Sequence, residues 1–162
     1  MMKRVVCALV LAAMLAGSAF GKVRDFGEFT ADVPYGWRAR KQDDGTFMME
    51  TYDGSMGLGI FAQSLNGITA EEMARNTSKR LKGSRPVYDR KAGIYRFRFR
   101  LNGYEWRMAV KGFEEENKAV IVTWAGLGIK KHLEQVLGSI KAKADTENNS
   151  AVEETLGSIK AK

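Results

Sequence analysis

The sequence predicts an α+β fold, in which a mostly antiparallel β-sheet is flanked by two helices and an extra helical tail follows at the C-terminus. Three observations indicate this class. Short segments of β-branched and aromatic residues are separated by turn residues, an Asn-Gly dipeptide joins two of these segments, and two stretches carry apolar residues at helical spacing. The chain has 162 residues, which favours a single domain.

The chain begins with the features of an export signal. After a short cationic start, the twelve residues Val5–Ala16 are apolar. A membrane-spanning helix needs about 20 such residues, so this run is too short to be one. The small residues at 17–21 fit a cleavage site. Residues 1–21 are therefore predicted to be a signal peptide cleaved before Lys22, with the bond after Ala19 as second choice, and the mature protein is expected in the periplasm or outside the cell.

Composition excludes several chemistries. The signal removes Lys3, Arg4 and the only cysteine, Cys7, so the formal charge falls from +7 to +5 over the remaining 141 residues. The only histidine is His132. Thiol catalysis and nitrogen–sulfur metal sites are therefore excluded, and we expect neither a metal nor a cofactor. No later apolar run approaches membrane-spanning length, so a soluble mature chain is expected.

Four short segments with strand character open the mature domain. They cover 26–33, 37–42, 46–52 and 57–63, and clusters of Gly, Asp, Pro and Ser separate them. The short connections predict a meander of antiparallel hairpins.

A helix is predicted to follow these strands and to run from Thr69 to Lys82. Thr69 and Glu72 form a capping box, with acidic residues in the first turn and basic residues in the last. Gly83 is expected to supply a left-handed cap. The apolar stripe is narrow, so we expect the helix to lie on the sheet with its other side in water.

The second half contains the strongest strand signal, a hairpin around Asn102-Gly103. A two-residue turn sets the register of 94–101 against 104–111. One side of this ribbon then pairs apolar residues only, namely Tyr95–Val110, Phe97–Met108, Phe99–Trp106 and Leu101–Tyr104. Residues 118–124 are apolar on both faces and predict a central strand. Residues 129–140 predict the closing helix, although Lys130 and Lys131 oppose its dipole.

The C-terminus contains a repeat. Leu137–Lys143 recurs letter for letter as Leu156–Lys162, 19 residues later. We interpret it as a duplication of the closing helix. Only one copy can fill a single docking groove, and the first copy has the fuller apolar stripe. Residues 22–143 are therefore predicted to form the domain, and residues 144–162 a mobile or loosely docked tail.

A family resemblance rests on two short motifs and the order of these elements. The motifs are Phe29-x-x-x-Val33-Pro34-x-Gly36-Trp37 near the mature start and Ser139-Ile140-Lys141 in the closing helix. Over about residues 24–142 the chain resembles the PsbP-like superfamily, which includes the extrinsic oxygen-evolving subunit of photosystem II and exported bacterial relatives. The resemblance implies an antiparallel sheet flanked by helices and an accessory or binding role in place of catalysis. It carries over no photosynthetic cofactor or metal site.

Few residues suggest catalysis. His132 is interpreted as a surface residue of the last helix. Asp43-Asp44-Gly45 lacks the further oxygen ligands of a calcium loop and is expected to be a turn. Gly54–Gly59 lacks the glycine order of a phosphate loop. The alternative to a binding role is an exported hydrolase-like enzyme that uses carboxylates such as Glu50 or Asp53 near that loop.

A group of cations occupies the other side of the hairpin. Arg98 is predicted to face Arg107, a like-charge pair with Cβ atoms about 4.5–5.5 Å apart, and Arg100 to form an ion pair with Glu105. Such a surface requires full hydration or an anionic partner. Full hydration would make it a solvated outer face that discourages aggregation at sheet edges.

The function expected from these cations is that of an exported, non-catalytic binding or accessory module. Its predicted ligand-binding residues are Arg96, Arg98, Arg100, Arg107 and Lys111. The partners considered are an acidic protein, an anionic lipid head group and an envelope polyanion. Nucleic acid fits poorly, because export separates the chain from it and the aromatic rings face the core, where they cannot stack on bases.

Overall fold

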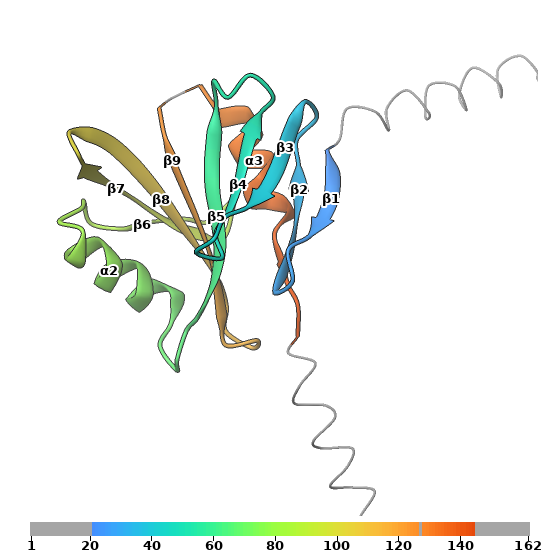
Figure 1. The fold of residues 1–162 in the computed structure, drawn as a ribbon. Helices are drawn as coiled ribbons and strands as arrows, with labels where there is room; N and C mark the ends of the chain where they lie inside the picture. Colours follow the sequence, from blue (N-terminus) through green and yellow to red (C-terminus); the bar gives the residue numbers. More distant parts are fainter. Residues whose placement is uncertain (1–20, 127, 145–162) are drawn as a thin grey trace, which may run out of the picture.

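An antiparallel sheet of seven strands forms the centre of the domain (Figure 1). The computed structural model describes residues 21–126 and 128–144. The strands of this large sheet lie in the order β3-β4-β5-β9-β8-β7-β6. Their bounds are β3 Trp37–Lys41, β4 Phe47–Thr51, β5 Gly57–Ser64, β6 Val87–Asp89, β7 Ile94–Leu101, β8 Tyr104–Phe113 and β9 Lys118–Ala125.

Two helices and a small second sheet complete the fold. The small sheet has the order β1-β2-β10, formed by Lys22–Asp25, Phe29–Val33 and Lys141–Ala142. Helix α2 (Ala70–Arg80) packs on β7 and β8, whereas α3 (Lys130–Ser139) lies behind the large sheet, beside β2 (Figure 1). The predicted fold class, an antiparallel α+β domain with two helices, is confirmed.

The predicted meander of four strands is wrong at its first member. Strand β2 does not join the large sheet. It pairs with β1 and β10, with Thr30 opposite Lys141. Its buried residues Phe29, Ala31 and Val33 belong to the core around α3. A local pattern identifies a strand but not its partner, because alternation reports only which side chains are buried. The short strands β1, β6 and β10 were also not predicted.

Helix α2 has the predicted start and a different end. Thr69 and Glu72 form the capping box, with N···O distances of 2.9 and 3.2 Å. At the other end the left-handed residue is Lys82 (φ 52°), not Gly83, and the Gly83 amide donates to the Ser78 carbonyl. Gly83 is required for a different reason: a Cβ there would lie 2.6 Å from the carbonyl oxygen of Arg98.

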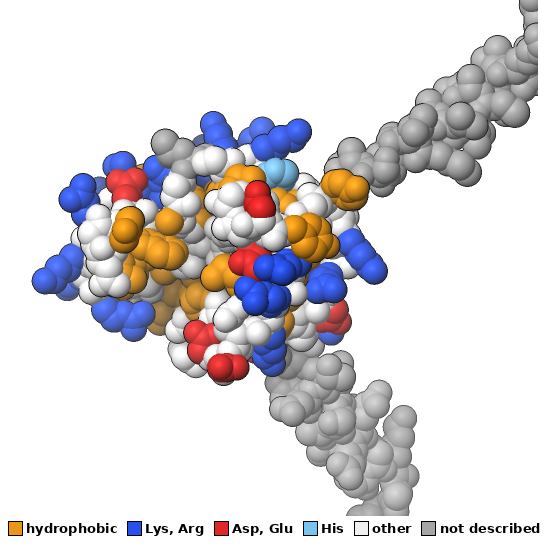
Figure 2. Space-filling view, turned by 45° about the horizontal axis from the view of Figure 1, so that its top comes forward, with side chains coloured by type: hydrophobic (Ala, Val, Ile, Leu, Met, Phe, Trp, Pro, Cys, Tyr) orange, Lys and Arg blue, Asp and Glu red, His pale blue; other side chains and the backbone are white. Residues whose placement is uncertain are grey.

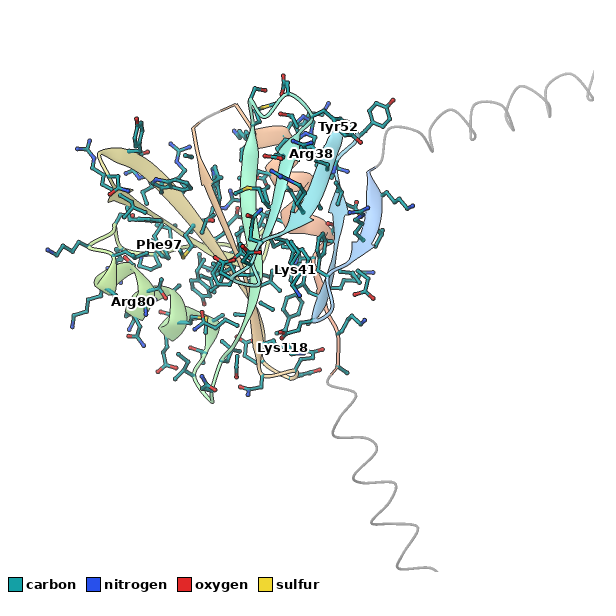
Figure 3. The ribbon with its side chains drawn as sticks, in the orientation of Figure 1. Arg38, Lys41, Tyr52, Arg80, Phe97 and Lys118 are labelled. Carbon is teal, nitrogen blue, oxygen red and sulfur yellow. The ribbon has the colours of Figure 1, made fainter. Side chains whose placement is uncertain are left out.

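The hairpin register is confirmed at every predicted pair. Asn102 and Gly103 have φ values of 51° and 82°, as the two-residue turn requires. Phe97 lies between the sheet and α2 (Figure 3). Strand β9 is central, as predicted, between β5 and β8. Only the outermost apolar pair, Leu101 and Tyr104 beside the turn, is exposed.

The first copy of the repeat is docked, as predicted, but it is only partly helical. Leu137 and Ile140 are buried, and α3 ends at Ser139. Lys141 and Ala142 then form β10, so the interpretation of the copy as helix alone is wrong. The predicted signal peptide lies outside the described residues except for Gly21, and the predicted tail lies outside them except for Ala144.

The large sheet carries a separate core on each face. The core under α2 contains the apolar side of the hairpin and Ala70, Met73 and Ala74. The core on the opposite face joins β2, α3 and the remaining side of the sheet, including Ala109, Val122 and Trp124. Strands β7 and β8 therefore present their arginines on the same side as α3.

A candidate anion-binding groove

An open groove of about 620 Å³ lies between the arginine-bearing side of β7 and β8 and the first part of α3. Its size is within the range of about 300–1,000 Å³ that is usual for small-molecule sites. We call it the arginine groove. Its charged lining residues are Arg85, Arg96, Arg98, Arg107, Lys130 and Glu134. Basic side chains also stand along the rim of the molecule in Figure 2, with hydrophobic side chains exposed between them.

Strand geometry brings the predicted arginines together. Arg96 and Arg98 are two residues apart on β7, so their side chains leave the same face. Arg107 on β8 is the register partner of Arg98. These three of the five predicted site residues line the groove.

Arg96 is a structural residue as well as a lining residue. Its guanidinium lies 3.0 Å from Asp89 on β6 and 3.0 Å from Glu134 on α3. Its side chain is only 25% exposed, which corrects the prediction that all these arginines face water. A backbone hydrogen bond from Ala92, followed by the charge of Arg96, lowers the pKa of Asp89. Arg96 therefore ties β7 to both walls of the groove.

Glu105 contacts both of the opposed arginines. Its carboxylate is 3.1 Å from Arg107 and 4.0 Å from Arg98, whose side chain is 63% exposed. The predicted ion pair between Glu105 and Arg100 is wrong, although the two are register partners. Glu105 and Arg107 are two apart on one strand and share a face, which allows the shorter contact. The single carboxylate of Glu105 thus compensates part of the charge of both Arg98 and Arg107.

The other two predicted site residues lie outside the groove lining. Lys111 donates from Nζ to the carbonyl oxygen of Leu137 near the end of α3, at 3.0 Å. Burial lowers the pKa of Lys111. Arg100 is exposed near the hairpin turn and makes no ion pair with any described residue. Lys111 is therefore a packing residue, and Arg100 lies apart from the groove.

Sequence reasoning missed two cations of the groove. Arg85 precedes β6, which was not predicted, and Lys130 opens α3. A signal existed for Lys130, because a cation in the first helical turn opposes the dipole. Helix α3 has no acidic residue in its first turn and no side-chain cap. The positive end of its dipole therefore adds to the charge of Lys130 in place of being neutralised.

The wall of the groove contains apolar side chains. Trp124 of β9 and Leu133 of α3 line it and are themselves largely buried. Val87 of β6 also lines it and is 68% exposed. The groove therefore combines a cationic rim with apolar walls.

The carboxylates of the alternative enzyme make structural contacts. Glu50 accepts from Arg38 at 3.0 Å and from Arg40 at 2.6 Å. Hydrogen bonds from Thr51 and then Ser55 lower the pKa of Asp53 to about 2. A carboxyl group with this pKa is ionised at neutral pH and is a poor general acid. Neither residue lines the arginine groove.

The other candidate motifs have structural roles. Gly45 and Gly54 adopt positive φ in turns, and a Cβ on Gly59 would lie 2.9 Å from the Thr123 hydroxyl. His132 is half-buried against Trp37, with ring centroids 5.3 Å apart. In the described part of the chain, no three His, Cys, Asp or Glu residues are placed to hold a metal ion. None of its helices is long and apolar enough to cross a membrane.

Comparisons with known proteins support the fold alone. No family model matches the chain, and no curated protein matches it by sequence. A crystal structure from Bacteroides thetaiotaomicron VPI-5482 is similar, with a TM-score of 0.51 and 18% sequence identity. The match covers 77% of this chain and 49% of that one, so this chain spans about half the length of its structural neighbour.

Proposed function

We propose that this chain is an exported, non-catalytic binding or accessory module that holds an anionic partner in the arginine groove. The observation that carries the proposal is the convergence of cations from three parts of the fold on one groove. Arg98 and Arg107 come from the hairpin, Arg85 from the segment before β6, and Lys130 from α3. Clefts lined with one sign of charge concentrate ligands of the opposite sign.

The charge balance around the groove favours an anion. Asp89, Glu105 and Glu134 contact its cations, which number five, so a surplus of two positive charges remains. Arg85 and Lys130 make no ion pair with any described residue. Guanidinium groups also suit carboxylate and phosphate, because their planar donors can bind two oxygens at once.

Location and kinship are part of the same proposal. The cationic start, the apolar run and the small residues before Lys22 support export to the periplasm or outside the cell. The motifs around Trp37 and Ile140 support a relationship to the PsbP-like superfamily. Both follow from sequence patterns alone. An N-terminal sequence of the protein recovered from the cell envelope tests the cleavage site directly.

Charge reversal in the groove tests the function. We expect wild-type protein to bind heparin, used here as a polyanion probe, and Arg98→Glu/Arg107→Glu to bind at least tenfold more weakly. The reason is that the variant replaces two guanidinium donors with anions, and one charge-assisted hydrogen bond alone contributes about 1.5–3 kcal/mol. Isothermal titration at fixed ionic strength measures the difference.

A matched variant separates the groove from overall charge. Lys79→Glu/Arg80→Glu changes the net charge equally but lies at the end of α2, on the opposite side of the sheet (Figure 3). We expect it to bind heparin nearly as well as wild type. Equal binding by all three proteins, with circular dichroism showing that all are folded, would contradict the proposal.

A further inference from the structure

The walls of the arginine groove restrict the kind of anion that fits it, provided that the proposed function holds. Val87 exposes 68% of its residue surface and is the main apolar wall, whereas the buried side chains of Trp124 and Leu133 reach the groove only with their edges. A compact inorganic anion would leave Val87 in water. Burying apolar surface is favourable, so a ligand with a hydrocarbon part gains free energy that a bare anion does not.

The available cations lie at the rim of the groove, whereas Arg96, whose charge is compensated, lies inside it. Arg96 is paired with both Asp89 and Glu134, so its charge is already compensated. Arg85 and Lys130 have no ion-pair partner among the described residues, and Arg98 is 63% exposed. An anionic head group therefore finds its partners at the rim, where it also stays partly hydrated.

We propose that the ligand is an amphipathic anion, a linear hydrocarbon chain with one carboxylate head group. The chain lies against Val87 and the edges of Trp124 and Leu133, and the carboxylate contacts the exposed rim cations Arg85, Arg98 or Lys130. This arrangement buries the chain without burying the charge, which is the costly step in binding an ion to an apolar site.

Titration of the full mature chain with acetate, octanoate and dodecanoate, each kept below its micelle concentration, tests the inference. We expect no measurable binding of acetate and at least tenfold tighter binding of dodecanoate than of octanoate, since each buried methylene contributes about fourfold in affinity. The neutral analogue dodecanol should bind at least tenfold more weakly than dodecanoate.

Two substitutions locate the chain in the groove. Val87→Asn should reduce the gain in affinity from octanoate to dodecanoate several-fold. Val23→Asn is the matched control, because Val23 is similarly exposed (64%) but lies on β1, outside the groove. In a two-dimensional ¹H–¹⁵N spectrum, the indole N–H of Trp124 should shift with dodecanoate, and that of Trp37 should not.

The outcomes separate this inference from the proposed function. If heparin binding depends on Arg98 and Arg107 but all three carboxylates bind alike, the function stands and the amphipathic ligand is wrong. Equal binding of dodecanol and dodecanoate also overturns the inference. So does dodecanoate binding that Val87→Asn does not weaken and that leaves the Trp124 indole signal unshifted. If Arg98→Glu/Arg107→Glu affects neither heparin nor dodecanoate, both proposals fail.

Discussion

Arg96 and Arg98 stand two residues apart on one strand and have different roles. Arg96 is paired with acids from β6 and α3, whereas Arg98 remains 63% exposed and only shares Glu105. Strand alternation predicts correctly that both leave the same face. It does not predict which one an adjacent element covers, because the covering acid Glu134 is 38 residues away in sequence from Arg96.

Asp53 allows a test of pH dependence at a single residue. Its pKa is lowered from 3.8 to about 2 by hydrogen bonds from Thr51 and Ser55. A carboxyl group whose pKa is lower in the folded than in the unfolded state stabilises the fold at any pH above its unfolded-state pKa. This contribution is lost as the pH falls through its folded-state pKa. We therefore expect the stability advantage of wild type over Asp53→Asn to be full above pH 3.8 and to disappear towards pH 2.

Two measurements check this expectation. Carboxyl ¹³C shifts should place the titration of Asp53 near 2, and thermal unfolding of both proteins over this pH range should show the curves converging. An Asp53 titration at the ordinary value of 3.8 would show that the turn does not hold the anion.

At the scale of elements, local chemistry was sufficient wherever the partners are close in sequence. The capping box joins Thr69 to Glu72, three residues on, and the hairpin register follows from a two-residue turn. Strands β1 and β10 were missed because they are short and charged, and only pairing with β2 makes them strands. Their stability comes from contacts distant in sequence, which a local pattern does not contain.

The docked copy of the repeat predicts the effect of truncation. Leu137 and Ile140 of the first copy are buried, and the Lys143 amide donates to the Glu28 carbonyl at 2.9 Å. A chain that ends at Lys143 should therefore keep its melting temperature within a few degrees of the full mature chain, as measured by differential scanning calorimetry.

A shorter truncation is the control for this prediction. A chain that ends at Gly138 loses Ile140 and the pairing of β10 with β2, so its melting temperature should fall clearly. Removing one buried isoleucine side chain alone costs about 2–5 kcal/mol. If the chain that ends at Lys143 collapses as well, the second copy contributes to the fold and the prediction is wrong.

At the scale of the whole molecule, the second core determines the surroundings of the basic face of β7 and β8. The sequence predicts a surface of cations in water, but the same side of β8 carries Ala109, which is completely buried under the layer that contains α3. The cations therefore lie at the border of this layer, where some pair with it and some remain available. A groove results where a bare sheet face was expected.

Lys111 tests how α3 is attached to the sheet. Its Nζ donates to the Leu137 carbonyl, and burial lowers its pKa, so the gain from the hydrogen bond is partly offset by desolvation. Lys111→Met keeps the hydrocarbon stem and should lower the free energy of unfolding by about 1 kcal/mol. Urea unfolding measures the change.

Arg100→Met removes a cation from the neighbouring hairpin surface and should leave stability almost unchanged, because Arg100 is exposed and has no ion pair with any described residue. Equal stability losses for Lys111→Met and Arg100→Met would show that the contact between Lys111 and α3 contributes nothing specific.

The sequence by itself determined the hairpin, its register, the start of α2 and the burial of the first repeat copy. In each case a short stretch of chain contains both the residues and the turn or cap that positions them. Only the tertiary structure decided that β2 belongs to a second sheet, that Glu134 neutralises Arg96, and that Arg85 and Lys130 join Arg98. These arrangements depend on how two layers pack across one sheet, and packing brings together side chains whose proximity is not encoded in any local period.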